Sequence, residues 1–508
     1  MSRRKGEKGM VDYALQPDTR DLPKFPKKRR TSWPKAVFAV LLVILGVSLL
    51  GRELYLYLTA HRNRSSAQST RGETSLSPKH QQALAALIQS RYTHMDDYEK
   101  WIPVLYQQKD FPAIEGRVID LLRERGDEAK AYELYTLYNT LGDIRHDQNK
   151  EIELKQNILN EWCDKQADSH IPWLVRGVFL TGYAWHFRGP GWARDVAQDA
   201  WPKFEAMLHR ARADLEKSYQ LNPNDPNSSC HLLIVARGLG LSRDKMERYF
   251  QNATSASPFH YGSHYQKLNY LMPKWHGTQQ EVNDFAAECM RSSGEHPFMG
   301  LVMIASLEES HHRSPQNTNY LGKDDIWPTV GKLYANYFNK YPDDIRRRFF
   351  YAYDAYLAQK YDVAIKQFEI IGDRWMEGTS WDSLNIYHRS RAYAYAAYAY
   401  TRLPPDQAMI VLKKSIDLDP YQKSSYFKLG TTAAKLGQYD EAEAAYLEAL
   451  EIDPNSAEAH LLLCQIYEKT NNSRQAKYHG ERALQCNPTD QQKKTAKNYI
   501  NVSNRGLK

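Results

Sequence analysis

Three prolines spaced 34 residues apart constrain the fold of this chain more than any other feature of its sequence. They occur in the pairs Asp419-Pro420, Asp453-Pro454 and Asn487-Pro488. Proline has no backbone N–H and cannot continue a helix, so each pair predicts a helix end. Small residues recur in phase with these prolines, and a fixed period of this length is typical of stacked helical units. The sequence therefore predicts an array of helix pairs near its C-terminus.

The unit 423–456 resembles the tetratricopeptide repeat position by position. The matching residues are Tyr426, Leu429, Gly430, Gly437, Tyr439, Ala442, Tyr446, Ala449 and Pro454. Small residues let two helices cross closely, and the large ones fill the space beside the crossing. The following unit and two earlier ones, beginning near 389 and near 345, keep parts of the pattern. The resemblance implies an all-α chain, an α-solenoid of helix-turn-helix repeats that binds other proteins.

A second resemblance covers residues 110–295, where helices are also expected from apolar residues at three and four spacing. The segments 187–192 (FRGPGW) and 270–277 (YLMPKWHG) are similar to motifs of an uncharacterised bacterial domain family related to tetratricopeptide proteins. This resemblance implies a helical fold and a bacterial origin. It implies no activity.

An apolar segment near the N-terminus predicts a membrane anchor. Residues 36–50 (AVFAVLLVILGVSLL) carry no charge, and apolar and aromatic residues continue to about 56. A span needs roughly 20 residues, so we place a single transmembrane helix at 34–56. The stretch before it is longer than the charged region of an ordinary signal peptide, which favours an uncleaved anchor. Because the basic cluster 27–30 precedes the span, the N-terminus is expected in the cytoplasm and the rest outside. In a bacterium this corresponds to the inner membrane and the periplasm.

Positive charge is concentrated in the N-terminal tail. The whole chain has a net charge of +8, and residues 1–35 contain eleven Lys and Arg against four acidic residues, which is +7. The remainder is nearly neutral, so the folded part lacks the basic surface of a nucleic-acid-binding protein. The five cysteines include no C-x-x-C pair, which argues against structural zinc and a disulfide framework. Buried single thiols are expected, with one or two disulfides as the alternative.

These observations divide the chain into seven segments. We expect a basic cytoplasmic tail (1–33), the transmembrane helix (34–56), a flexible linker (57–80), an irregular helical domain of unknown function (81–300), degenerate helical repeats (301–388), tetratricopeptide repeats (389–490) and a C-terminal tail (491–508).

The resemblance to tetratricopeptide repeats implies that the first helix of each unit lines a concave groove. The expected lining residues are Tyr393, Tyr400, Phe427, Leu461, Gln465 and Glu468. Three of them, Tyr393, Phe427 and Leu461, stand where some relatives use lysine to hold a C-terminal carboxylate. This favours an apolar or aromatic contact with the partner. The alternative is that the tyrosines of 393–400 form the core between repeats.

Two glycine- and tryptophan-containing turns, 185–192 and 270–277, suggest a ligand site as a rival hypothesis. Its candidate residues are Arg188, Trp192, Lys274, Trp275 and His276. Glycines could let backbone amides approach an anion, with Arg188 supplying charge. The structural alternative is that the glycines turn the chain while the tryptophans pack the corner. The ligand hypothesis requires the two turns to lie within about 20 Å of each other.

Two histidine-containing clusters give weaker signals. His260 and His264 are four residues apart, but no Glu lies between them as in metalloprotease helices, so packed histidines are expected in place of a metal site. The segment 308–312 (EESHH) precedes Ser314-Pro315 and is expected to be a solvated loop. No nucleophile motif or paired carboxylates stand out, so neither an enzyme nor a cofactor is expected.

Together these features predict a membrane-anchored scaffold of the bacterial cell envelope that binds a protein partner in the groove of its repeats. The alternative is an enzyme or a module for a small ligand or glycan, centred on the turns 185–192 and 270–277. Homo-oligomerisation through the repeats is a third hypothesis.

Overall fold

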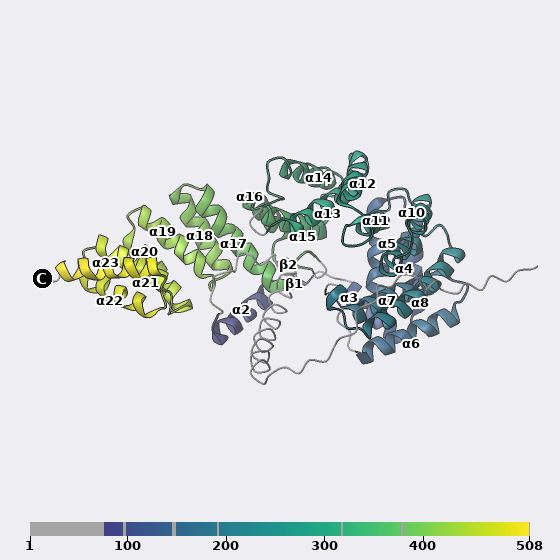
Figure 1. Cartoon of the computed structure of the whole chain (residues 1–508), viewed down its shortest axis with the longest axis horizontal. Helices are drawn as coiled ribbons and strands as arrows, with labels where there is room; N and C mark the ends of the chain where they lie inside the picture. Colours follow the sequence, from purple (N-terminus) through teal and green to yellow (C-terminus); the bar gives the residue numbers. More distant parts are fainter. Residues whose placement is uncertain are drawn as a thin grey trace, which may run out of the picture. The chain divides into compact units, whose positions relative to one another are not determined.

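The computed structural model describes residues 76–94, 98–144, 149–189, 191, 193–315, 319–376, 379–381 and 383–506 (Figure 1). The predicted tail, the predicted membrane helix at 34–56 and most of the linker lie outside these residues. Within them, no helix has both the length and the apolar character that crossing a membrane requires.

The first half of the described chain is helical apart from one short strand. Its elements are α2 (Pro78–Arg91), β1 (Thr93–His94), α3 (Tyr98–Gln108), α4 (Phe111–Arg123), α5 (Glu128–Leu141), α6 (Asn149–Lys165), α7 (His170–Arg188), the 3₁₀ turn η2 (Ala193–Asp195), α8 (Ala200–Leu221), α9 (Pro226–Leu239), α10 (Arg243–Ala256), α11 (Tyr261–Leu271) and α12 (Gln279–Arg291).

The second half has the same character. It comprises α13 (Pro297–Arg313), α14 (Trp327–Lys340), α15 (Ile345–Leu357), α16 (Tyr361–Ile371), β2 (Arg374–Trp375), α17 (Leu384–Arg402), α18 (Pro405–Leu418), α19 (Lys423–Lys435), α20 (Tyr439–Ile452), α21 (Ala457–Lys469), α22 (Ser473–Gln485) and α23 (Asp490–Gly506). Residues 490–506, most of the segment expected to be a tail, thus form a helix that packs on α22 and α21.

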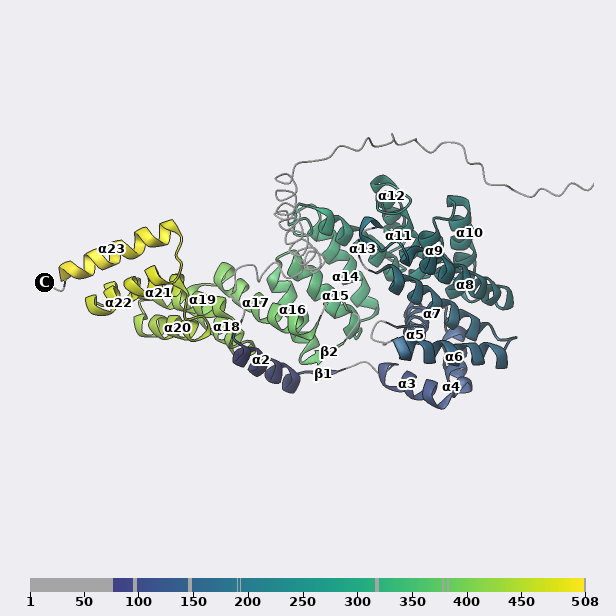
Figure 2. The same cartoon turned by 60° about the horizontal axis from the view of Figure 1, so that its bottom comes forward.

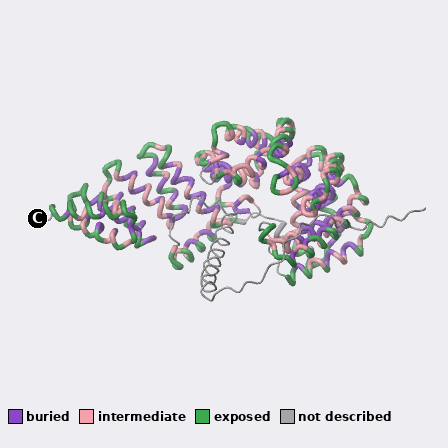
Figure 3. Tube along the Cα trace, in the orientation of Figure 1, coloured by how far each residue is buried: buried purple, intermediate pink, exposed green. Residues whose placement is uncertain are grey.

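Successive helices pack as pairs, and the first helices of neighbouring pairs also touch. In the C-terminal part the pairs are α17–α18, α19–α20 and α21–α22, with α17 against α19 and α21 against α23. Upstream, α7 packs on α8 and α9 on α10, while α7, α9, α11 and α13 contact one another in turn. Figure 3 shows buried stretches where helices face each other and exposed ones on their outer sides. The prediction of an all-α solenoid is therefore confirmed for the described residues.

The helix ends and crossings follow the pattern read from the sequence. Helices α18, α20 and α22 end at Leu418, Ile452 and Gln485, each just before one of the three phased prolines. Gly430 lies where α19 crosses α20, and a Cβ atom added there would be 2.5 Å from the ring of Tyr446. Only a glycine permits this approach, which explains the small residue at that position.

The segment 76–94, which contains α2 and β1, packs against β2 and α17, which are distant in the sequence (Figure 2). Strand β1 pairs in parallel with β2, in the register Thr93 to Arg374. The Arg91 guanidinium donates to the carbonyl of Asp417 at 3.1 Å, and the Tyr92 hydroxyl lies 3.1 Å from Nδ1 of His388. Helix α2 therefore belongs structurally to the C-terminal part of the chain, although some 300 residues separate them in sequence.

The hydrophobic core is rich in aromatic side chains upstream and in alanines within the C-terminal repeats. All five cysteines are free thiols, and four of them are buried. This agrees with the expectation of packed single thiols.

Candidate functional site

The first helices of the C-terminal pairs carry the predicted groove residues. Tyr400, Gln465 and Glu468 are exposed, on α17 and α21. The other three predicted residues, Tyr393, Phe427 and Leu461, are half-buried. Tyr400 has 42% of its surface exposed, which is high for a large aromatic side chain in a helix array.

Two lysines of α19 lie over two tyrosines of α17. Lys428 Nζ is 5.4 Å from the ring centre of Tyr393, and Lys435 Nζ is 5.0 Å from that of Tyr400. Both tyrosines and both lysines are seven residues apart, or about 10 Å along a helix at 1.5 Å per residue. The two Tyr–Lys pairs thus form a regular cationic and aromatic strip across the first two of these helices.

The four tyrosines of α17 have different environments. Tyr395 is buried, Tyr393 and Tyr398 are half-buried, and Tyr400 is exposed. Tyr393 packs edge-on against Tyr361, with ring centres 6.1 Å apart, so it also joins α17 to the preceding helix pair. A pocket of about 350 Å³ lies beside it, lined by Gln359, Lys360, Tyr361, Asp362, Tyr398 and Arg402.

Glu468 lies at the far end of the repeats, in a pocket of about 370 Å³. Helix α23 supplies Tyr499, Val502, Ser503 and Arg505 to this pocket, and α21, α22 and the turn between them supply the rest. The predicted groove residues therefore do not share one pocket. The contribution of α23 escaped sequence reasoning because we expected a tail there.

The two tryptophan-containing turns meet in space, as the ligand hypothesis requires. Trp185 and Trp275 touch edge-to-face with ring centres 5.6 Å apart. The Arg188 guanidinium carbon lies 5.3 Å from the Trp185 ring, 5.7 Å from the Trp275 ring and 5.9 Å from the Trp201 ring. A second arginine, Arg237, lies 5.6 Å from the Trp185 ring and 5.4 Å from the Trp275 ring. We call these five residues the Trp–Arg cluster.

The helices around the Trp–Arg cluster explain its geometry. Arg188 and Arg237 are near the C-terminal ends of α7 and α9, which pack on each other. Arg188 donates from Nη1 to the carbonyls of Gly189 and Gly191, both at 3.0 Å. Burial lowers the pKa of both guanidinium groups from the ordinary value. Both arginines remain protonated at neutral pH, so the cluster is a partly desolvated cationic site.

The remaining candidates of the ligand hypothesis have structural partners. Lys274 pairs with Glu309 at 3.0 Å, and Nε2 of His276 lies 2.8 Å from the carbonyl oxygen of Arg237. Trp192 lies outside the described residues. Arg237 was missed because its sequence neighbourhood carries no motif, and only the packing of α9 brings it to the two turns.

The segment 308–312 forms the last turns of α13, so the prediction of a solvated loop there was wrong. Its Glu308 belongs to a second group of buried polar side chains. Burial raises the pKa of Glu308 and, well above its usual range, that of the neighbouring Asp354. Tyr334 donates to Asp354 at 2.7 Å. The side chain of Arg347 is buried near these carboxyls and lies over several rings, including that of Tyr337 at 5.5 Å. The charge of Arg347 lowers the pKa of both carboxyls and so opposes the effect of burial in part.

The histidines at 260 and 264 are packed and hydrogen-bonded, as expected. His260 caps α11, with Nδ1 2.8 Å from Ser263 Oγ, and Nδ1 of His264 lies 3.0 Å from the carbonyl oxygen of His260. Burial lowers their pKa values to about 3 and about 4, so both are neutral. In the part of the chain that the structure describes, no three His, Cys, Asp or Glu side chains are grouped to hold a metal.

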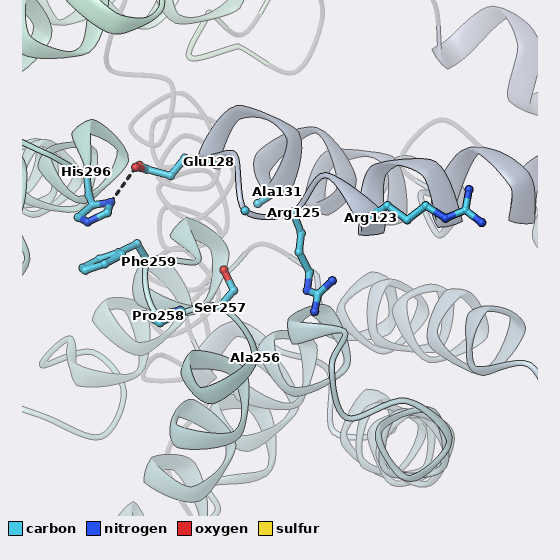
Figure 4. A pocket seen from close by; sticks show the side chains of 10 residues that line it. Arg123, Arg125, Glu128, Ala131, Ala256, Ser257, Pro258, Phe259 and His296 are labelled. Atoms are coloured by element: carbon cyan, nitrogen blue, oxygen red, sulfur yellow. Dashed lines mark hydrogen bonds and ion pairs between the residues drawn. The ribbon is translucent and has the colours of Figure 1, made fainter.

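A pocket of about 380 Å³ lies where the turns before α5, α11 and α13 meet (Figure 4). His296 stacks on Phe259 with ring centres 3.4 Å apart, and its Nδ1 is 2.9 Å from Glu128 Oε1. Glu128 also accepts from Lys340 Nζ at 3.4 Å. Figure 4 shows Arg123 pointing away from the other lining side chains. Within the lining, His296 and Glu128 pair with each other, while Arg123 pairs with Asp120 and Arg125 donates to the carbonyl of Leu122.

Comparisons with known proteins identify the C-terminal repeats. A family model described as "TPR repeat" matches residues 432–471, and one described as "Tetratricopeptide repeat" matches residues 411–444. The predicted tetratricopeptide repeats are thereby confirmed in this region. The resemblance of residues 110–295 to a second family stays a prediction. No curated protein matches the chain.

Two solved structures illustrate what the chain is similar to. The crystal structure of yeast Tom70 is 13% identical, with 93% of this chain and 97% of that chain covered and a TM-score of 0.26. The TPR domain of P58(IPK) is 14% identical, with 73% and 98% covered and a TM-score of 0.23. Scores this low identify no relative and no partner.

Proposed function

We propose that this protein is a membrane-anchored scaffold that binds a protein partner along the first helices of its C-terminal repeats. Tetratricopeptide repeats support binding of a protein. The observation that carries the proposal is the exposed strip of Tyr400 and Lys435 beside Tyr393 and Lys428. Exposed aromatic side chains next to cations are typical anchors at protein interfaces.

The strip favours an extended, acidic segment of the partner. The two Tyr–Lys pairs repeat after about 10 Å, and in an extended polyproline II segment, with three residues per turn and a rise of about 3.1 Å, every third side chain returns to the same face after about that distance. An acidic side chain at every third residue could therefore meet Lys428 and Lys435 in turn. Apolar side chains next to these acids would lie on the tyrosine rings.

The proposed location rests on the sequence alone. The apolar segment 34–56, preceded by the basic cluster 27–30, supports a single-pass anchor in the inner membrane of a bacterium, with the repeats in the periplasm. This role requires no catalysis, cofactor or nucleic acid. Protease treatment of spheroplasts tests the topology, because residues 76–506 should be cleaved from outside while the N-terminal tail stays protected.

Site-specific photo-crosslinking in cells tests the binding surface. A benzophenone side chain placed at Tyr400, Phe427 or Leu461 should give a discrete crosslinked band with one partner protein. The matched control is Tyr478 on the outer helix α22, which is 53% exposed and should give none. Bands of twice the chain mass would instead indicate homo-oligomerisation. Equal crosslinking from Tyr478 and the three groove positions would contradict the proposal.

Substitution at the strip should weaken the complex. Tyr400→Ala removes the exposed anchor and should lower affinity by tenfold or more, the size expected for a central aromatic residue. Lys435→Glu should reduce affinity further at low salt than at high salt, because it reverses a charge facing an acidic segment. Tyr478→Ala serves as the control and should leave affinity unchanged.

A further inference from the structure

The Trp–Arg cluster places two cationic groups in a part-buried site without a negative partner. Arg188 has two backbone carbonyls and three indole rings as its neighbours, and Arg237 has the side chain of Gln266 and two indole rings. Within the described residues, neither arginine pairs with a carboxylate. A desolvated charge normally has a counter-charge, because removing an ion from water is otherwise unfavourable.

Two other part-buried arginines of this chain have such a partner. Arg176 forms a bidentate pair with Asp214 at 2.7 and 2.8 Å. Arg391 pairs with Asp373 at 2.8 Å. The Trp–Arg cluster differs from these two sites, because two arginines without an ion pair lie over the same two indole rings.

The unpaired groups around the cluster are hydrogen-bond donors. The Nε–H of Arg237 and the indole N–H of Trp185 are buried and have no acceptor. Buried donors without acceptors are unfavourable, and a bound group rich in acceptors would satisfy them. The cluster therefore lacks both a negative charge and hydrogen-bond acceptors. A bound anion would supply both.

We propose that the Trp–Arg cluster binds a small organic anion, with its carboxylate or phosphate between Arg188 and Arg237 and its flat body against Trp275 and Trp201. Guanidinium groups donate two parallel hydrogen bonds to such anions. The half-buried indole rings offer stacking surface for a planar or ring-shaped body. The proposal is independent of the partner-binding strip and adds a ligand site to the upstream region.

The structural alternative is that the arginines stabilise helix ends. Both lie near helix C-termini, where a cation interacts favourably with the helix dipole, and Arg188 donates to two terminal carbonyls. That role explains the hydrogen bonds of one nitrogen of Arg188, Nη1. It does not explain the unpaired Nε of Arg237 or the indole N–H of Trp185. The two interpretations predict opposite effects of removing Arg237.

Calorimetric titration and thermal unfolding of the full chain in a non-ionic detergent distinguish the anion site from the purely structural role. The probes are phenyl phosphate, benzoate, inorganic phosphate and neutral phenol. We expect phenyl phosphate or benzoate to bind and raise the Tm, with the stronger of the two distinguishing a phosphate from a carboxylate ligand. Inorganic phosphate should bind at least tenfold more weakly because it lacks a stacking surface, and phenol should not bind.

Variants complete the test. Arg237→Gln and Arg188→Gln should each weaken binding of the best probe by tenfold or more. Without a probe, Arg237→Gln should raise the Tm, because it removes an uncompensated charge. Arg212→Gln is the control, since that arginine pairs with Glu216 at 3.0 Å and should leave binding unchanged. The proposal is overturned if no anion binds, if both arginine variants bind as the unaltered chain does, or if Arg237→Gln lowers the Tm.

Discussion

The repeats α17–α23 and the upstream region α3–α16 use the same helix-pair architecture but fill it differently. Between α19 and α20 the contact consists of small residues and one large ring, with Gly430 beneath Tyr446. Upstream, α5, α9 and α11 enclose Tyr138, Asp225, His231 and His260, all buried. The contact between α19 and α20 therefore depends mainly on shape, whereas α5, α9 and α11 add buried histidines and a buried carboxylate to a core rich in aromatic side chains.

This difference in packing affects how each part of the chain should respond to pH and to substitution. A contact between small and large residues depends only on volume and is repeated with the period of the sequence. A buried polar network depends on each partner being present, because an unsatisfied group is costly. We expect α5, α9 and α11 to be more sensitive to pH and to single polar substitutions than α19 and α20, whose crossing should be sensitive to volume added at Gly430.

The largest expected effect is acid destabilisation of the upstream region. Burial lowers the pKa of His231 to about 4, of His260 to about 3 and of His264 to about 4. Their folded pKa values lie below the unfolded value near 6.5, so the stability they contribute is present above pH 6.5 and is lost as pH falls towards 4. At pH 5 the lowered pKa of each of these histidines should reduce the free energy of unfolding by about 2 kcal/mol.

Hydrogen exchange at pH 7 and pH 5, corrected for intrinsic rates, measures this loss. Amides of α9 and α11 should lose protection at pH 5, and those of α19 and α20, which contain no histidine, should keep it. Equal loss in both pairs of helices would remove the proposed distinction between the regions.

The next effect is loss of the central carboxylate of the polar network. Asp225 caps α9 and accepts from the Tyr138 hydroxyl at 2.7 Å and from the Asn227 amide N–H at 2.9 Å. Asp225→Ala leaves these buried donors unpaired and should reduce the free energy of unfolding by about 3–5 kcal/mol. Urea unfolding measures the change. Asp199 is the matched control, because it precedes α8 without a capping hydrogen bond, and Asp199→Ala should cost less than about 1 kcal/mol.

The sequence predicted the repeats because their determinants are local. Phased prolines and small residues appear in the chain itself, so helix ends and the crossing at Gly430 could be anticipated. The convergence of Arg237 with the two tryptophan-containing turns could not be anticipated from the sequence, because it depends on how α7, α9 and the turn after α11 pack. The position of segment 308–312 before Ser314-Pro315 predicts a solvated loop, but the segment ends helix α13. The pairing of Thr93 with Arg374 has no sequence signal.

Added volume should affect the repeats. In Gly430→Ala the new methyl group would meet the buried Tyr446 ring at 2.5 Å, and repacking should cost about 1–3 kcal/mol. Gly116 on α4 is the control, because nothing lies within 4 Å of its Cβ position. Gly116→Ala should stabilise by about 0.5–1 kcal/mol. Thermal unfolding measures both. A neutral Gly430→Ala would mean that the crossing of α19 and α20 repacks around the added methyl group without cost.

The smallest expected effect is that of Tyr92→Phe, which tests whether the segment 76–94 is held by its contacts with the repeats. The Tyr92 hydroxyl contacts His388 Nδ1 at 3.1 Å and accepts from Arg391 at 3.4 Å, both on α17. Tyr92→Phe should cost about 1 kcal/mol. Amides of α2 and the Thr93 amide, which donates to Asp373, should then exchange about fivefold faster while α9 is unaffected. Unchanged exchange would mean that the buried Leu84 and Ile88 hold α2 in place without this contact. Faster exchange would show that the polar contacts of Tyr92 help to hold α2 on the repeats.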